Sequence, residues 1–299
     1  MTEKQRAYLI LHFCVLVWGF TAILGKLISL QALPLVWWRV FLCSITLFFM
    51  LNKADRMAPG INGALRMLGI GMVTGLHWLC FYGAIKLSNA SVALAMMAMT
   101  SFFSALVEPF ILKKRFVWKE LALGILILPG MWLIVDDLDW TMRQGVIVGM
   151  LAALLAAVFT SFNKREIDLY SPKPLTMSFY ELTGGVIITS IGLAVVQPHW
   201  DTMVPVGWDW LWLFVLAYFC TLLTYFLVLK VLKHLGAFTV NLTTNLEPVY
   251  GIALAILIFR EDQHLTTNFY IGVFIVLCAV LCHPFLKGAD RVVQPVEKI

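Results

Sequence analysis

Polar residues recur at helical spacing within an apolar stretch of the second half of the chain. Asn241, Thr244, Asn245 and Pro248 fall at positions i, i+3, i+4 and i+7, which is one face of a helix, with Glu247 at its edge. Pro248 frees the carbonyl of Thr244 from its helical hydrogen bond. Glu247 lies about 16 Å from the end of the stretch, so its carboxylate could hold a substrate cation or a coupling proton. Alternatively, these groups join helices by hydrogen bonds.

Two earlier apolar stretches carry further candidates for the same site. His77, Trp78 and Tyr82 lie at similar depth, with Trp78 and Tyr82 one turn apart. His77 could titrate near neutral pH, or it could serve only as a hydrogen-bond partner for a neighbouring helix. Methionine repacks around different ligands, although a methionine stripe in a bundle is ordinarily core. The next stretch adds Met96, Thr100 and Phe103.

Four charged residues within apolar stretches could act as anchors or gates. Arg39 and Lys26 lie toward one end of their stretches, and Arg39 is the stronger candidate for an anion anchor because Lys26 could extend to the membrane surface. In the second half, Lys164 and Glu181 occupy the opposite end and could form a buried pair that closes a cavity. Lys164 could also reach the surface.

The composition requires a membrane around these residues. Of the 299 residues, 61% are hydrophobic and only 13% are charged, with a mean hydropathy of +0.88. A soluble domain needs about 25% charged residues. The composition therefore excludes a soluble nucleic-acid-binding protein, a disordered chain and a secreted disulfide scaffold, despite a net charge of +5.

The apolar stretches predict an all-α integral membrane protein with ten transmembrane helices. A spanning helix needs about 20 apolar residues. The predicted helices are 7–30, 34–51, 64–87, 90–112, 117–135, 144–163, 174–196, 207–231, 236–259 and 268–286.

The positive charges of the loops predict the orientation. Lys4 and Arg6 precede an apolar run longer than a signal-peptide core, which indicates a retained first helix. Nearly all loop Lys and Arg residues share the side of the N-terminus, whereas Lys86, Arg143 and Arg260 lie on the other side. The positive-inside rule then places both termini in the cytoplasm. The six cysteines form no CxxC pair and are expected to pack as small apolar residues.

The chain also contains a weak internal repeat. A shift of roughly 148 residues places Leu87 on Leu235 and Gly124 on Gly272. The repeat predicts one five-helix unit over 1–140 and a second over 141–299. Because five is odd, the second unit enters the membrane from the opposite face, as in many secondary transporters, unless the match between apolar helices is fortuitous.

Several short motifs together resemble a known family. The motifs are Trp18-Gly19-Phe20, Pro34 with Arg39, Asn245-Leu246-Glu247-Pro248 and Phe259-Arg260-Glu261. They are similar to those of the EamA-like branch of the drug/metabolite transporter superfamily. The resemblance implies solute transport, often export, across a bacterial inner membrane. It further implies a cavity lined by helices 1 to 4 and 6 to 9, with helices 5 and 10 as outer supports.

Transport is the function that the sequence favours. The chain lacks HExxH, GxSxG and P-loop motifs, so we expect no enzymatic activity, cofactor or ATP drive, and an intramembrane enzyme is the weakest alternative. We expect no metal site, no nucleic-acid partner and a monomer in the lipid bilayer. Basic Arg39 and acidic Glu247 favour a zwitterion such as an amino acid, moved by alternating access and with protons as candidate coupling ions. The alternative is efflux of a lipophilic cation or drug.

Overall fold

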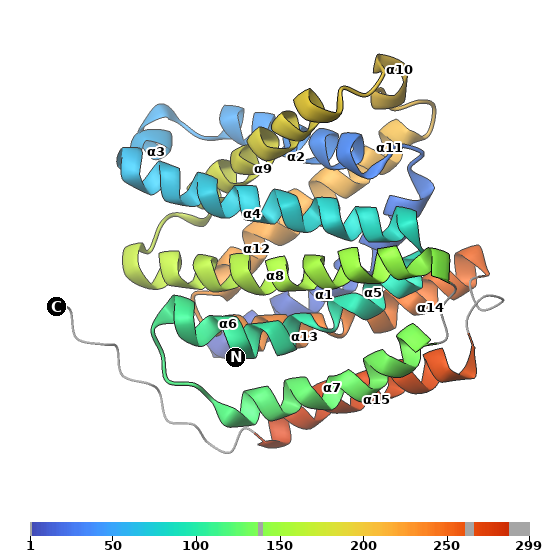
Figure 1. Ribbon diagram of the computed structural model, residues 1–299. Coiled ribbons are helices and arrows are strands. Elements are labelled where there is room, and N and C mark those ends of the chain that lie inside the picture. The colour runs from blue at the N-terminus through green and yellow to red at the C-terminus, as the bar shows by residue number, and fades with distance from the viewer. Residues whose placement is uncertain (1, 137–139, 261–265, 287–299) are drawn as a thin grey trace.

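The structure, a computed structural model, describes residues 2–136, 140–260 and 266–286 and is built of helices throughout those ranges (Figure 1). The first half contains α1 (Glu3–Leu27), α2 (Ala32–Met50), the short α3 (Lys53–Met57), α4 (Gly60–Leu87), α5 (Ala90–Met97), α6 (Thr100–Leu112) and α7 (Trp118–Asp136). The second half contains the 3-10 turn η1 (Trp140–Met142), α8 (Arg143–Tyr170), α9 (Pro174–Val196), α10 (Trp200–Met203), α11 (Asp209–Phe214), the π-helix η2 (Val215–Leu223), α12 (Thr224–Val231), α13 (Ala237–Thr244), α14 (Glu247–Phe259) and α15 (Thr267–Leu286).

All ten predicted stretches are helical, which confirms the all-α membrane fold. Within the described residues, 8 helices are long and apolar enough to cross a membrane when α5–α6, α11–α12 and α13–α14 are each taken as one span. Most predicted ends agree with the structure within the roughly two to four residues expected of such boundaries. The C-terminal tail that was expected in the cytoplasm, with Lys287 and the residues beyond it, lies outside the described residues.

The predicted end of the sixth spanning helix, residue 163, is wrong. The helix α8 continues to Tyr170 and ends at Ser171, which adopts a left-handed conformation with φ of 45°. Lys, Arg and Glu are good helix formers, so the charged turns after Asn163 extend the helix beyond its apolar part. An apolar stretch therefore marks the part of a helix that lies in the membrane, and not the end of the helix.

Two spans are broken at corresponding places in the two halves. The break between α5 and α6 falls at Ala98 and Met99, and that between α13 and α14 falls at Asn245 and Leu246. Pro248 lacks the N–H group that would bond to the Thr244 carbonyl. Matching breaks are expected of a fold that is built from two inverted repeats.

No proline occurs at the break in the first half. Here the Thr100 hydroxyl donates to the Met97 carbonyl at 2.7 Å, so a side chain takes over a backbone acceptor. The amide N–H groups of Ala98 and Met99 bond to carbonyls three residues earlier, at 3.1 Å and 3.0 Å, and this tightens the chain at the break. The Thr100 hydroxyl thus competes for a backbone carbonyl at the break in the first half, where the second half has Pro248.

Glycines allow α4 and α9 to pack closely. Gly71 of α4 faces the backbone of Glu181, and Gly75 faces Gly185, so that a Cβ atom on either α4 glycine would collide with α9. Small residues spaced by four commonly join helices in membranes, because they let two backbones approach closely. Burying an apolar side chain between helices contributes little free energy there, since the lipid around it is apolar as well. The contact fixes the position of Glu181 relative to the centre of the bundle.

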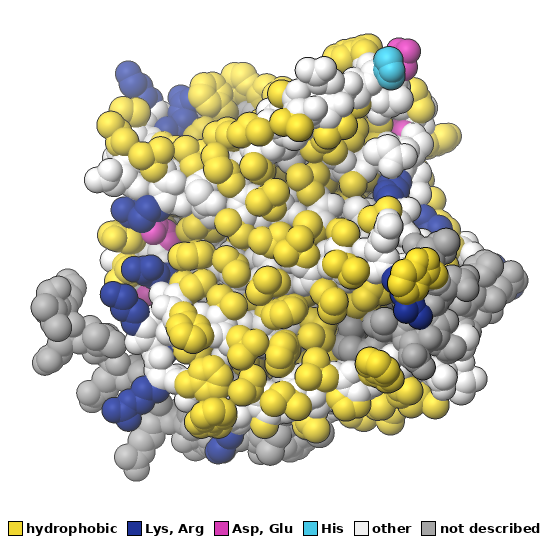
Figure 2. All heavy atoms as spheres, viewed as in Figure 1, with side chains coloured by type: hydrophobic (Ala, Val, Ile, Leu, Met, Phe, Trp, Pro, Cys, Tyr) yellow, Lys and Arg dark blue, Asp and Glu magenta, His cyan; other side chains and the backbone are white. Residues whose placement is uncertain are grey.

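The outer surface is suited to lipid. Large apolar side chains such as Phe49, Ile61 and Val195 are 78%, 79% and 79% exposed. Figure 2 shows apolar side chains across the middle of the molecule and a row of Lys and Arg side chains along the left edge, where α4 begins and α8 ends in Figure 1. Helices α7 and α15 pack against each other at the edge of the bundle, in the outer position that the resemblance implied.

Candidate functional site

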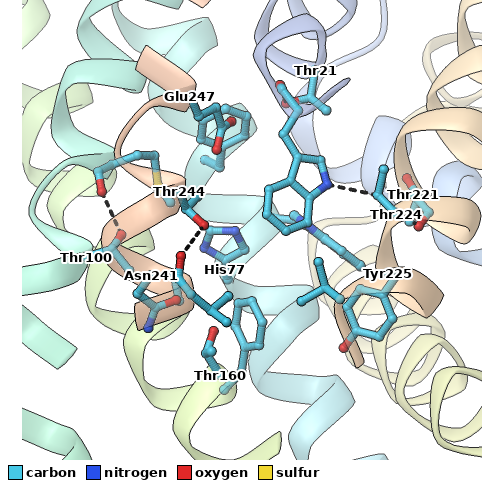
Figure 3. A pocket seen from close by; sticks show the side chains of 18 of the residues that line it. Thr21, His77, Thr100, Thr160, Thr221, Thr224, Tyr225, Asn241, Thr244 and Glu247 are labelled. Atoms are coloured by element: carbon cyan, nitrogen blue, oxygen red, sulfur yellow. Dashed lines mark hydrogen bonds between the residues drawn. The ribbon is translucent and has the colours of Figure 1, made fainter. Parts of the chain in front are cut away.

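A central cavity of about 90 Å³ lies between the two halves (Figure 3). Binding sites for small molecules usually measure roughly 300–1,000 Å³, so the cavity must widen to hold most metabolites. Its lining includes Trp18, Thr21, Arg39, His77, Trp78, Phe81, Met97, Thr100, Phe159, Thr160, Asn163, Cys220, Thr221, Thr224, Tyr225, Leu232, Asn241, Thr244 and Glu247.

Arg39 from α2 is a buried cation that neutral groups hold in place. Its side chain is 3% exposed. The Nη1 group donates to the Tyr82 hydroxyl at 3.0 Å, and Nε donates to the Thr221 hydroxyl at 2.5 Å. The guanidinium carbon lies 4.3 Å from the centre of the Trp78 ring. Among the described residues Arg39 has no ion pair, so its charge is available to an anionic ligand.

A π-helical segment positions the Thr221 hydroxyl. In η2 the Thr221 side chain donates to the Leu216 carbonyl, five residues earlier, at 2.6 Å. The wider turn directs Cys220 and Thr221 toward the cavity, which Thr224 at the start of α12 also borders, and π-helical turns recur at functional sites. Thr224 in turn accepts a hydrogen bond from the Trp18 indole at 2.9 Å, which joins α12 to α1 across the cavity wall.

Glu247 is the acidic residue of the cavity wall. It begins α14 directly after the helix break and is 6% exposed. A carboxylate is favoured there because the free N–H groups of a helix start carry partial positive charge. Within the described part of the chain, its carboxylate has no hydrogen bond or ion pair from a side chain. The cavity therefore presents one carboxylate and one guanidinium, which interact electrostatically but form no direct ion pair within the described residues.

His77 contributes a defined hydrogen-bonding group. Its Nδ1 atom lies 2.8 Å from the Ala152 carbonyl oxygen. A carbonyl can only accept a hydrogen bond, so Nδ1 must carry the hydrogen, and Nε2 of the neutral ring is left as an acceptor. The ring packs between Phe81 and Phe159, at centroid distances of 6.4 Å and 5.3 Å. His77 can thus accept a hydrogen bond from a ligand in an otherwise aromatic part of the wall.

Hydrogen bonds join the two broken spans where they cross. Asn241 donates to the Ser104 hydroxyl at 2.5 Å, and Asn245 donates to the Ser101 hydroxyl at 2.8 Å. At one end of this crossing Glu108 accepts from the Phe238 amide at 2.7 Å. The amide groups of Asn241 and Asn245 therefore connect helices, and of the two only Asn241 also borders the cavity.

The structure divides the predicted site residues into two groups. Seven border the cavity, namely Arg39, His77, Trp78, Thr100, Asn241, Thr244 and Glu247. Five do not border it, namely Tyr82, Met96, Phe103, Asn245 and Pro248. Of these five, Tyr82 contacts the site through its hydrogen bond with Arg39. Met96 packs over Gly149 of α8, and the neighbouring Met97 borders the cavity.

The predicted gate residues have partners other than those expected. The Lys164 ammonium bonds to the Asp168 carboxylate at 2.6 Å and to the Leu232 carbonyl at 3.0 Å. Glu181, which is 1% exposed, accepts a hydrogen bond from Tyr225. Lys164 and Glu181 are therefore not paired in this conformation. The Lys26 ammonium lies 4.4 Å from the centre of the Phe259 ring.

A polar clasp at the far end of α1 had no signal in the sequence. The Asp209 carboxylate of α11 accepts from the Ser29 amide at 3.0 Å and from the Ser29 hydroxyl at 2.5 Å. Lys86 donates to the Ile28 carbonyl at 2.7 Å beside it. The bonds between Ser29 and Asp209 connect the first half of the chain to the second, whereas the bond between Lys86 and Ile28 lies within the first half.

Comparisons with known proteins define the class. The sequence matches the EamA-like transporter family over residues 5–136 and again over residues 143–283. The chain therefore belongs to the EamA-like transporter family, and it is a multi-pass membrane transporter and not an enzyme.

A solved structure supports the fold alone. That structure, described only as the crystal structure of a protein, superposes on this chain with a TM-score of 0.72. Its sequence identity is 14%, and the match covers 96% of this chain and 100% of the other. No curated protein sequence matches the chain.

Proposed function

We propose that this transporter exports amino acids or related zwitterions across a bacterial inner membrane, with both termini in the cytoplasm. Membership of the family supports transport, and the Lys and Arg residues of the loops support the orientation. In this proposal the two inverted units divide between residues 140 and 141 and rock around the central cavity.

The observation that carries the proposed substrate class is the pair of opposite charges in the cavity wall. A zwitterion would place its carboxylate on Arg39 and its ammonium on Glu247. Neither residue forms a direct ion pair with a protein group within the described residues, and burying an ion without such a pair is costly. A ligand with both charges would satisfy the two residues at once, whereas a ligand with one charge would leave the other unpaired.

The clasp between Ser29 and Asp209 fits the outward gate of an alternating-access cycle. It connects the two halves on the side that the loop charges place outside the cell. On the other side the cavity wall extends past Asn163 to Leu232, next to Lys164. We therefore interpret this conformation as closed toward the outside.

The aromatic wall favours a second candidate, a lipophilic cation. Trp18, Trp78, Phe81, Phe159 and Tyr225 border the cavity and could hold an organic cation through cation–π contacts, with Glu247 as its counter-ion. Such a substrate carries no anionic group to compensate the Arg39 charge, and its own positive charge would be repelled by the Arg39 guanidinium. Efflux of a cation should therefore tolerate the loss of Arg39, whereas transport of a zwitterion should not.

Counterflow in proteoliposomes separates the two candidates. A panel of radiolabelled amino acids and tetraphenylphosphonium would be measured for the wild type, Arg39→Ala and Arg143→Ala. Arg143 is a matched control because it also stacks on a ring, 4.7 Å from the centre of Trp140, but is exposed outside the cavity. The proposal expects amino-acid counterflow that is lost only in Arg39→Ala. Counterflow of the cation alone, unchanged in Arg39→Ala, would replace it with the second candidate.

A further inference from the structure

A second hollow lies on the outside of the bundle, between the start of α4 and the end of α8. It has a volume of about 370 Å³, several times that of the central cavity. Its walls are apolar and are formed by Ile70, Val73, Phe162 and Leu169. At one end stand Arg66 and Arg165. The hollow is therefore a groove with an apolar length and a basic end.

Gly69 forms the open part of this groove. It is exposed, and a Cβ atom built on it would meet no other atom within 4 Å. Most other glycines of α4 lack such space, since a Cβ atom on Gly71 or Gly75 would collide with α9. Gly69 thus leaves a gap among the large apolar side chains that cover the rest of the lipid-facing surface, such as Leu65, which is 60% exposed.

The basic end retains hydrogen-bond donors for an anion. Arg66 contacts the Glu166 carboxylate through Nε at 3.0 Å and Nη2 at 3.1 Å and stacks on Tyr170 at 3.9 Å, so its Nη1 donors remain unused. Arg165 is exposed and has no ion pair within the described residues. Two arginines and one glutamate leave a net charge of +1 at this end of the groove.

The groove lies where phospholipid headgroups are expected. It is at the edge of the apolar surface, on the side where Lys and Arg side chains gather in Figure 2. A phospholipid combines an acyl chain, which fits the apolar walls, with a phosphodiester, which fits the arginines. Basic pockets between membrane helices bind anionic lipids for the same reason.

We propose that this groove binds one anionic phospholipid, with its phosphodiester between Arg66 and Arg165 and one acyl chain along the hollow over Gly69. Glu166 holds the Arg66 guanidinium in position, and Arg165 supplies the charge that selects a headgroup with a net negative charge over a zwitterionic one. The site is separate from the central cavity, so it does not depend on the identity of the transported substrate.

Native mass spectrometry of the purified full-length protein tests the proposal. The detergent-solubilised protein would be titrated with phosphatidylglycerol, phosphatidylethanolamine or glycerol 3-phosphate. We expect one tightly held phosphatidylglycerol per chain, weaker binding of phosphatidylethanolamine and no binding of glycerol 3-phosphate. Arg165→Gln should weaken phosphatidylglycerol binding about tenfold, since a hydrogen bond to a charged group is lost. Gly69→Leu should abolish it by filling the groove.

Controls separate a specific site from general attraction of lipid. Arg115→Gln removes one exposed charge outside the groove and should leave binding unchanged. Gly69→Ala adds only a small group in open space and should fold like the wild type even if Gly69→Leu does not. Equal weakening by Arg115→Gln and Arg165→Gln would overturn the proposal. So would equal binding of the two phospholipids, or binding of glycerol 3-phosphate as tight as that of the lipid.

Discussion

The support around Arg39 makes a graded prediction for substrate affinity. Arg39→Gln removes the cation that the proposed substrate carboxylate contacts. If two charge-assisted hydrogen bonds of about 1.5 kcal/mol each are lost, the dissociation constant should rise by more than about a hundredfold. Tyr82→Phe removes the 3.0 Å bond that holds Nη1 and a hydrogen bond with Thr21, while Thr221 and Trp78 still hold the guanidinium. Its effect should therefore be smaller, up to about tenfold.

The assay is equilibrium binding of radiolabelled phenylalanine, chosen because of the aromatic wall, to purified protein. Tyr180→Phe is the matched control, since the Tyr180 hydroxyl donates to the Arg56 carbonyl at 2.6 Å outside the cavity. We expect affinity to fall in the order wild type and Tyr180→Phe, then Tyr82→Phe, then Arg39→Gln. An Arg39→Gln variant that is folded and binds within twofold of the wild type would refute the reasoning, as would equal effects of the two tyrosine variants.

Three further predictions concern gating, coupling and packing. Asp209→Asn should weaken the outer clasp and increase labelling of Cys220, in an otherwise cysteine-free chain, by an impermeant maleimide added outside; unchanged labelling would argue against a gate there. Glu247→Gln should abolish both accumulation and substrate exchange, because it removes the charge that the proposed substrate ammonium contacts; exchange that survives without pH dependence would make Glu247 a proton-coupling residue instead, and wild-type flux with a wild-type pH profile would limit it to a structural role. Gly71→Ala should lower the thermal midpoint of the protein more than Gly83→Ala, which meets only Val148 at 3.5 Å, and equal midpoints would contradict the close packing of α4 on α9.

The sequence was sufficient to predict the helices because lipid imposes a simple length rule. Runs of about 20 apolar residues become spanning helices, and all ten predicted runs are helical, with 8 candidate spans within the described residues. The rule failed at the end of α8, where charged residues continue the helix into the polar region. The break at Glu247 was indicated by Pro248, whereas the equivalent break before Thr100 had no proline to indicate it.

The site was only partly predictable because helical spacing shows which residues share one face of a helix. It does not show how the helix is rotated about its axis relative to the cavity. Met97 borders the cavity and Met96 does not, although the two are adjacent. The π-helical turn that directs Thr221 toward Arg39 has no proline or glycine within it, so no residue type indicated it. Asp209 was similarly hidden, since a single acidic residue at a helix start is ordinarily only a favourable first-turn charge.

The most direct test of a zwitterion site is the competition of related ligands for wild-type transport. Radiolabelled phenylalanine counterflow would be measured against unlabelled phenylalanine, phenethylamine, which lacks the carboxylate, and N-acetylphenylalanine, which lacks the ammonium. If Arg39 and Glu247 each bind one end of the substrate, phenylalanine should compete strongly and the two single-charge analogues should compete weakly. Competition by phenethylamine as strong as that by phenylalanine would contradict the account.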